Sequence, residues 1–297
     1  MTSMETIVYG KWILAGEHAV LRGSPALVFP VFAKALRLRY MNNSEPLSVE
    51  FEGEHGAELR LLFWGVIEKA FEMTGHERQE ARGKFVISSS IPVGAGLGAS
   101  ATLCVAVGRW FHARGWVGEA ELPEFCRQLE NLFHGESSGV DIAVALSARG
   151  LHYERNGTRR AIQPLWTPQW YISYSGKRGV TSECVARVKS LWQSDASLGE
   201  KIDRDMHDAV LMAERSLLSP YSEEAFDELA ESINKARTCF EHWGLASGEM
   251  GQHLQWLLNH GAYAVKPTGS GDGGYALSLW RKTPPVDVLA SLVPIAR

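Results

Sequence analysis

Alternating hydrophobic and polar positions mark several short segments of the chain as strands. Within residues 26–40, apolar side chains fall on every second position from Leu36 to Tyr40, and arginines lie between them. This is the pattern of a half-buried strand. By similar reasoning we expect strands at 6–15, 84–91, 151–155 and 170–174, and a strand-loop-strand over 262–280.

A second set of segments has apolar residues at helical spacing. These predicted helices span 59–73, 99–114, 121–133, 183–192, 202–218 and 223–243. The helix at 99–114 is apolar nearly all round and should be buried. In the helix at 121–133 the side chains expected to face inward are Leu122, Phe125, Leu129, Leu132 and Phe133. The class is α+β. The pattern of elements changes beyond about Arg149, and we place a domain boundary near residue 165, in the stretch from Pro164 to Pro168, which gives domains at 1–165 and 166–297.

Composition excludes several classes of protein. The 297 residues are 45% hydrophobic and 22% charged, with a net charge of -4, which argues against a disordered chain and against a nucleic-acid binder. No apolar run approaches the roughly 18 residues needed to cross a bilayer, and Met1 to Lys11 shows no secretory signal. The four cysteines form no CxxC pair, so we expect buried thiols in a cytoplasmic protein with no membrane partner.

The first candidate for chemistry is a glycine-rich loop at 91–102, which reads IPVGAGLGASAT. Gly94, Gly96 and Gly98 lie between a predicted strand and a buried helix, where flexible backbone and free N–H groups can cradle a phosphate. A tight turn needed only for packing is an equal alternative. The loop is no Walker A motif, and no strand follows its helix as a dinucleotide fold requires, so we reject a nicotinamide cofactor.

A second glycine loop, KPTGSGDGG at 266–274, lies between two predicted strands. Its four glycines and its hydroxyl groups exceed what a hairpin turn needs, which modestly favours an anion or substrate loop.

Charged residues at apolar positions provide the remaining candidates. Asp141 begins a small, apolar segment, where it is either a helix N-cap or a base or metal ligand. Glu130 lies at the edge of an apolar stripe, and by itself we expect it to be exposed. Lys11 interrupts a predicted strand and needs an anionic partner. Glu17 and His18 follow, and His18 is equally consistent with a core histidine.

Taken together and in this order, these motifs resemble the GHMP family of small-molecule kinases. The resemblance rests on GKWILAGEHAV at 10–20, on the 91–102 loop, on HGESSGVD at 134–141 and on the loop at 266–274. It implies a two-domain kinase with a ribosomal protein S5 domain 2-like N-terminal domain, which binds ATP, and a ferredoxin-like C-terminal domain. It also implies ATP-dependent phosphorylation of a small-molecule alcohol, such as mevalonate, with Mg²⁺. A homodimer is compatible with the sequence, which does not fix the oligomeric state.

The resemblance also implies roles for individual residues. Asp141 falls on the catalytic base and Lys11 on the lysine beside it. Ser100 and Glu130 fall on the Mg²⁺ ligands. The positions that match the triphosphate loop are Gly94, Ala95, Gly96, Leu97, Gly98, Ala99, Ser100 and Ala101. The positions that match the substrate site are Glu17, His18, Thr181, Gly269, Ser270 and Gly271.

Three departures from the family pattern separate this chain from its typical members. Tyr9 stands where the family usually has Pro, Ala99 replaces the first serine of the phosphate loop, and Asp272 replaces a glycine of the third motif. A kinase for another acceptor, such as phosphomevalonate or a sugar, and a non-catalytic binding module are therefore the alternatives.

Overall fold

The computed structural model describes residues 3–134 and 137–295 and forms two compact units that interleave along the sequence. The first unit comprises Met1–Lys11, Lys34–Val93 and Leu97–Ala148, and the second comprises Trp12–Ala33, Gly94–Gly96 and Arg149–Arg297. Strands β1 (Ser3–Ala15) and β2 (Ala26–Pro46) each contribute residues to both units. The two domains expected on either side of residue 165 stay a prediction, because the compact units are not separated by a single cut.

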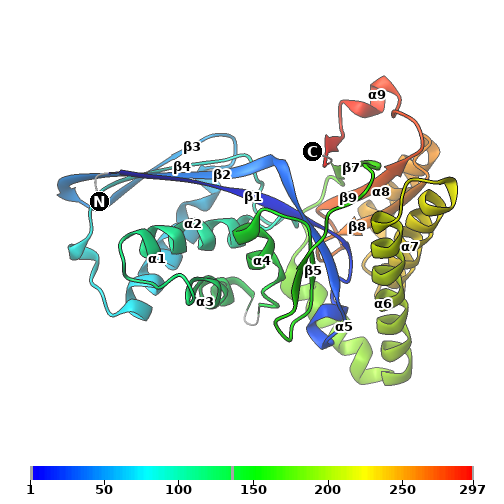
Figure 1. The fold of residues 1–297 in the computed structure, drawn as a ribbon, viewed down its shortest axis with the longest axis horizontal. Coiled ribbons are helices and arrows are strands. Elements are labelled where there is room, and N and C mark those ends of the chain that lie inside the picture. Colours follow the sequence, from blue (N-terminus) through cyan, green and yellow to red (C-terminus); the bar gives the residue numbers. More distant parts are fainter. Residues whose placement is uncertain (1–2, 135–136, 296–297) are drawn as a thin grey trace. The chain divides into compact units, whose positions relative to one another are not determined.

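The first unit packs helices against one face of a sheet. Its other strands are β3 (Ser48–Glu52), which runs parallel to β4, and β4 (Arg82–Ser89), which pairs antiparallel with β2. The helices that lie together on one face of these strands (Figure 1) are α1 (Arg60–Thr74), α2 (Ala99–Ala113), α3 (Leu122–His134) and α4 (Val140–Ser147). As the alternation predicts, Leu36, Leu38 and Tyr40 are fully buried.

Aromatic side chains fill the core of this unit. The ring centroids of Phe63 and Phe85 are 5.4 Å apart, and those of Phe85 and Trp110 are 5.0 Å apart, in edge-to-face arrangements. Such pairs add to the stabilisation that burial of their large apolar surface provides. Trp110 comes from α2, so this helix is fixed against the sheet at one end while its other end begins in the glycine loop.

The second unit contains two small groups of strands and most of the remaining helices. The first residues of β2 pair with β5 (Leu151–Tyr153), which pairs with β6 (Arg159–Ala161). A separate antiparallel sheet has the order β10-β7-β9-β8, formed by Val293–Pro294, Gln169–Tyr174, Tyr275–Trp280 and Ala264–Thr268. The helices are α5 (Thr181–Ser194), α6 (Ala196–Leu218), α7 (Glu223–His242), α8 (Gly248–Asn259) and α9 (Val286–Leu289).

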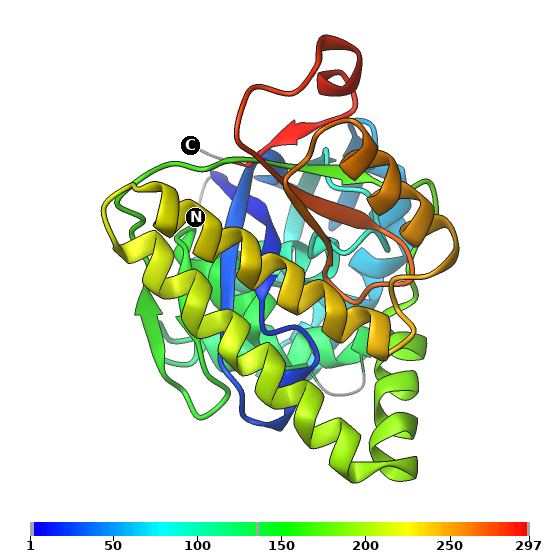
Figure 2. The ribbon, with the colours of Figure 1, turned by 90° about the vertical axis from the view of Figure 1, so that its right-hand side faces the viewer.

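Helices α6 and α7 are long neighbours that run side by side, as Figure 2 shows. Each begins with a side-chain cap: Asp195 accepts a hydrogen bond from Leu198 N, and Ser222 accepts one from Ala225 N. These caps satisfy N–H groups that a helix start leaves without intrahelical partners. Helix α7 also packs on β8, which brings Phe240, near the end of the helix, close to Gly271 of the second glycine loop.

The α+β class and the predicted elements listed above are confirmed, but one predicted buried residue is wrong. Leu132 is 47% exposed, because the buried face of α3 is centred between Phe125 and Glu130 and Leu132 lies at its rim. The pattern of residues did not predict β3, β6, α4, α8, α9 or β10. All four cysteines are buried free thiols. In the described part of the chain, no helix is long and apolar enough to span a membrane.

Candidate active site

Lys11 and Asp141 form an ion pair within the first unit, with 3.0 Å between Lys11 Nζ and Asp141 Oδ2. Lys11 is buried in β1, whereas the Asp141 side chain is 21% exposed. Asp141 lies in the first turn of α4, after the N-cap residue Gly139, so the interpretation of this acid as an N-cap is wrong. The anionic partner that a buried lysine requires is therefore a carboxylate that solvent can still reach.

Gly98 lies directly over this pair. A Cβ at position 98 would be 3.1 Å from Lys11 Cγ and 3.5 Å from Asp141 Oδ2. The φ of Gly98 is +75°, in the left-handed region that glycine adopts without a steric cost. In addition, Lys11 N–H donates to the Leu97 carbonyl over 3.0 Å. Glycine is thus needed here both for its conformation and for its close approach to the lysine.

The glycine loop presents mainly backbone. Gly94 and Gly96 also have positive φ, at 74° and 84°. The side chains of Ala95, Leu97, Ala99 and Ala101 are buried, so only their backbone groups could bind a ligand. Ser100 is partly exposed at the start of α2, whose first turn carries no acidic residue. A helix N-terminus with this environment favours an anion.

Glu130 is buried beside Asp141, contrary to the exposed position that we expected for it alone. Its residue surface is 2% exposed, and its carboxylate accepts a hydrogen bond from the Ser137 hydroxyl. Burial, and then the negative charge of Asp141, raise the pKa of Glu130 to about 8. Such a pair of acids is costly unless a cation or a proton offsets one charge.

These oxygen donors fit Mg²⁺. Glu130, Asp141 and Ser100 offer hard oxygens, and Mg²⁺ usually takes one or two carboxylates together with phosphates and water. The described residues contain no group of three or more His, Cys, Asp or Glu side chains that would hold a metal by themselves. A Mg²⁺ ion held by these oxygens would need further ligands from phosphate and water.

The second unit contains a buried ion pair of its own. Lys266 Nζ lies 2.5 Å from Glu17 Oε1, and both side chains are almost completely buried. Lys266 also donates to the Ile13 carbonyl over 3.2 Å, and Thr268 donates to the same carbonyl over 3.0 Å. Glu17, expected at the substrate site, therefore fixes β8 and the glycine loop after it to the segment that follows β1.

His18 contacts the second glycine loop through its Nε2, which lies 2.9 Å from the Ser270 carbonyl. Since a carbonyl only accepts, Nε2 carries the proton in this arrangement. Burial lowers the pKa of His18 to about 4, although the bond to Ser270 acts in the opposite direction. The ring also packs edge-on against Phe240 and Trp243. His18 is thus a neutral, buried histidine that holds the loop.

Residues 94–96 of the first glycine loop belong to the second unit, and their backbone contacts the backbone of the second glycine loop. A Cβ on Gly269 would be 3.1 Å from the Gly96 carbonyl oxygen, and one on Gly274 would be 2.6 Å from the Ala95 carbonyl oxygen. Gly269 therefore faces the first glycine loop. Ser270 is partly exposed, and its hydroxyl lies 3.4 Å from that of Thr181, at the start of α5. Gly271 is buried against Phe240 and Leu245.

Two residues of these clusters had no predicted role. Lys266 interrupts an apolar strand just as Lys11 does, so the same signal was available for it. Ser137 donates a hydrogen bond to Glu130. It follows residues 135–136 of the HGESSGVD motif, which lie outside the described residues. A serine in a glycine-punctuated turn carries no signal by itself.

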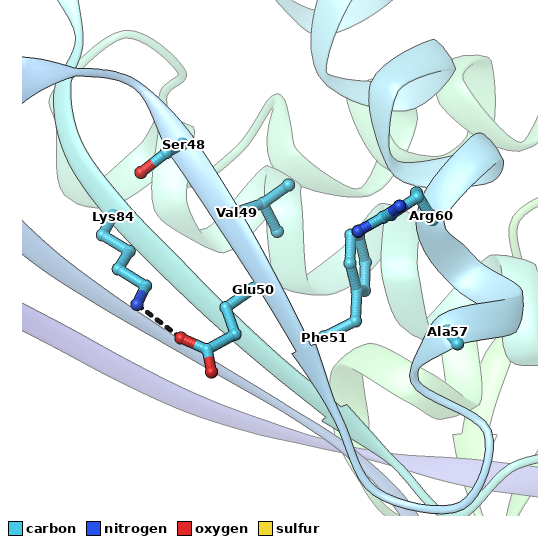
Figure 3. Close-up of a pocket in the computed structure, with 7 residues that line it drawn as sticks. All are labelled: Ser48, Val49, Glu50, Phe51, Ala57, Arg60 and Lys84. Atoms are coloured by element: carbon cyan, nitrogen blue, oxygen red, sulfur yellow. Dashed lines mark ion pairs between the residues drawn. The ribbon is translucent and has the colours of Figure 1, made fainter.

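A surface cavity elsewhere on the first unit contains none of the predicted site residues. It measures about 490 Å³ and is lined by Ser48, Val49, Glu50, Phe51, Ala57, Arg60 and Lys84 (Figure 3). The charges of Glu50 and Lys84 neutralise each other in an ion pair. We assign this cavity no role in the chemistry.

The sequence and the structure are also similar to those of known proteins. Residues 62–149 match the family model of the GHMP kinases N terminal domain. The chain is 29% identical to the mevalonate kinase of Pyrococcus horikoshii, over 92% of this chain and 88% of that protein.

Solved structures share the fold. L. major mevalonate kinase, in complex with R-mevalonate, has a TM-score of 0.79 at 21% identity and covers 94% of this chain and 88% of its own. The mevalonate kinase of Methanococcus jannaschii has a TM-score of 0.76 at 18% identity, with 97% and 94% covered. Residues 62–149 thus match the GHMP kinases N terminal domain, and the chain is similar over most of its length to mevalonate kinases.

Proposed function

We propose that the protein transfers the γ-phosphoryl group of ATP to the primary hydroxyl of mevalonate and so forms 5-phosphomevalonate and ADP. The observation that carries this proposal is the ion pair of Lys11 and Asp141 beneath Gly98, at the start of a helix that can receive phosphate. The similarity to mevalonate kinases selects the acceptor among alcohols.

Asp141 is the proposed base. Its partly exposed carboxylate takes the proton of the acceptor hydroxyl as that oxygen forms a bond to the γ-phosphorus and the bond to the leaving ADP oxygen breaks. Lys11 holds Asp141 in place and stabilises negative charge on the attacking oxygen. This stabilisation is worth most when the oxygen loses its proton, so Lys11 acts more on turnover than on binding.

The glycine loop and the first turn of α2 are the proposed triphosphate site, with backbone N–H groups from 94–101 as donors. Ser100 and Glu130 are the proposed protein ligands of Mg²⁺. When bound, Mg²⁺ neutralises the charge of the phosphates and orients them for transfer. The crowding of Glu130 against Asp141 supports this assignment, since a cation would relieve it.

On the acceptor side we assign contacts to Thr181 and Ser270, whose hydroxyls are partly exposed and adjacent. Glu17, Gly269 and Gly271 act by holding the loop in place. A bond from His18 to the carboxylate of the acceptor, which the family resemblance implies, stays a prediction. It requires His18 Nε2 to exchange the Ser270 carbonyl for that carboxylate.

The test is ADP release with Mg·ATP and a panel of acceptors. We expect turnover with mevalonate and little with phosphomevalonate or sugars. Turnover with another acceptor only would replace mevalonate as the substrate but keep the kinase. No turnover with any acceptor, together with intact ligand binding, would favour a non-catalytic binding module. The cytoplasmic location stays a prediction from the sequence, and the sequence does not fix the oligomeric state.

A further inference from the structure

The second glycine loop carries one acidic side chain, Asp272, which faces two basic residues. Asp272 Oδ1 lies 3.3 Å from Lys177 Nζ, and Asp272 Oδ2 lies 3.6 Å from Arg187 Nη2. Arg187 is itself anchored, because its Nη1 donates to the Gly244 carbonyl over 2.8 Å. One carboxylate therefore pairs with two cations. Lys177 lies in the connection between β7 and α5, and Arg187 lies in α5, the helix that begins at Thr181.

The backbone fixes these charges relative to the proposed acceptor contacts. Gly274 N–H donates to the Lys177 carbonyl over 2.7 Å, and Ser175 N–H donates to the Gly274 carbonyl over 2.9 Å. A Cβ on Gly273 would be 2.8 Å from the Lys177 carbonyl oxygen, so the two segments are in contact along their backbones. Asp272 follows Ser270 by two residues and is held by its own N–H, which donates to Leu245.

The stability of the fold does not account for this aspartate. Asp272 has a φ of +54°, where a side chain other than that of glycine is disfavoured, although Asp tolerates it better than most. Lys177 and Arg187 are both about half exposed, and ion pairs of such groups contribute little to stability. Because Asp272 follows Ser270 by two residues, its charge makes the electrostatic potential beside Ser270 more negative.

We propose that Asp272 is a specificity-determining residue, which offsets one of the two positive charges of Lys177 and Arg187 and so disfavours acceptors that carry a phosphate in addition to a carboxylate. The proposal rests on the proposed function only in placing the acceptor at Ser270 and Thr181. A phosphate adds a charge of nearly -2 at neutral pH. The effect of removing one carboxylate scales with the charge of the ligand, so for an assumed separation on the order of 10 Å a change in affinity of about twofold for a monoanion becomes about fivefold or more for the phosphorylated acceptor.

The experiment compares the wild type with Asp272→Asn and Asp272→Gly, the residue typical of the family. The dissociation constants of mevalonate and phosphomevalonate are measured by calorimetry at fixed ionic strength, together with KM for mevalonate. We expect both variants to bind phosphomevalonate about fivefold more tightly, or to bind it where the wild type does not. Binding of mevalonate should change by no more than about twofold.

A double variant, Asp272→Asn with Lys177→Gln, restores the net charge that this group has in the wild type and should return the preference to near the wild-type value, which a merely structural role would not do. Asp208→Asn, at an exposed carboxylate of α6, is the matched control and should leave the preference unchanged. The preference is the ratio of the dissociation constants of mevalonate and phosphomevalonate. The proposal is overturned if this ratio stays within twofold of the wild type in both single variants, or if no variant binds phosphomevalonate. Wild-type protein that fails to phosphorylate mevalonate would instead remove the proposed function, and the binding data would still decide the role of Asp272.

Discussion

Lys11 Nζ lies 3.0 Å from Asp141 Oδ2, which joins the first strand of the chain to the first turn of α4 beneath the glycine loop. Either charge without its partner would cost folding free energy. A buried lysine needs an anion, and an acid beside the buried Glu130 needs a cation. The pair satisfies both requirements and leaves one carboxylate partly exposed for chemistry.

Replacement of the proposed base tests this assignment most directly. In Asp141→Asn we expect kcat for ADP release to fall about 10²- to 10⁴-fold, because the amide cannot accept the hydroxyl proton. Binding of ATP, measured with a fluorescent nucleotide, should change little. The control Asp208→Asn makes the same chemical change at an exposed carboxylate and should keep activity within about twofold. Comparable turnover by the wild type and Asp141→Asn would rule out Asp141 as the base.

Loss of Lys11 should affect turnover more than nucleotide binding. For Lys11→Met we expect kcat to fall by about 10²- to 10³-fold, since the ammonium stabilises charge that develops on the attacking oxygen. The dissociation constant of ATP should rise less than about threefold. Steady-state kinetics and equilibrium binding separate the two effects. A variant that keeps kcat but binds ATP much more weakly would assign Lys11 to the triphosphate instead.

A methyl group at position 98 should disturb the pair that Gly98 covers. Gly98→Ala places a Cβ 3.1 Å from Lys11 Cγ at a positive φ, so we expect kcat to fall about 10- to 100-fold and the free energy of unfolding to fall by about 1–2 kcal/mol.

Gly115→Ala is the matched control for this change. Gly115 has a φ of +77°, and a Cβ there meets nothing within 4 Å. The Gly115→Ala variant should lose a similar free energy of unfolding, measured by urea denaturation, and keep its activity. Equal loss of activity in both variants would show that backbone strain, and not displacement of Lys11, is responsible.

The buried pair of the second unit should contribute strongly to stability. Lys266→Met removes the ammonium that neutralises the fully buried Glu17 carboxylate, and we expect unfolding to become easier by about 3–5 kcal/mol. Lys69→Met, at an exposed ion pair with Glu72, should cost no more than about 0.5 kcal/mol. The double variant Lys266→Met with Glu17→Gln should recover part of the loss. If Lys266→Met and Lys69→Met unfold at the same urea concentration, the buried pair is not a stabilising element.

His18 should make stability depend on pH in the acidic range. Its pKa is lowered to about 4 in the folded protein from 6.5, so between these values the unfolded state binds the proton and the folded state does not. The contribution of neutral His18 is complete above pH 6.5 and is lost as the pH falls toward 4, by up to about 3 kcal/mol.

The measurement for His18 is the difference in unfolding free energy between pH 7 and pH 5. This difference should be smaller in His18→Asn than in the wild type, whereas the exposed His242→Asn should retain it. Equal differences in the wild type and His18→Asn would mean that His18 is protonated in the folded protein.

Local pattern was sufficient for much of the fold. The alternation around Leu38 predicts a half-buried strand, and the apolar helix at 99–114 is α2, because period and burial are linked within one element. The pattern of apolar and polar residues does not predict α8, whose residues include several polar ones. It also does not predict short edge strands such as β6, which form only because a neighbouring strand pairs with them. Leu132 shows the limit even inside a predicted helix, since the centre of the buried face is set by what packs against it.

The sequence by itself determined the chemical groups of the site: three alternating glycines before a helix, a lysine inside an apolar strand, and an acid in an apolar segment. Only the tertiary structure decided their partners. Glu130 is buried beside Asp141, and Glu17 forms an ion pair with Lys266. His18 Nε2 donates a hydrogen bond to the Ser270 carbonyl. The physical reason is that each buried charge or polar group must find its partner far along the chain, and the folded backbone, not local spacing, sets which groups meet.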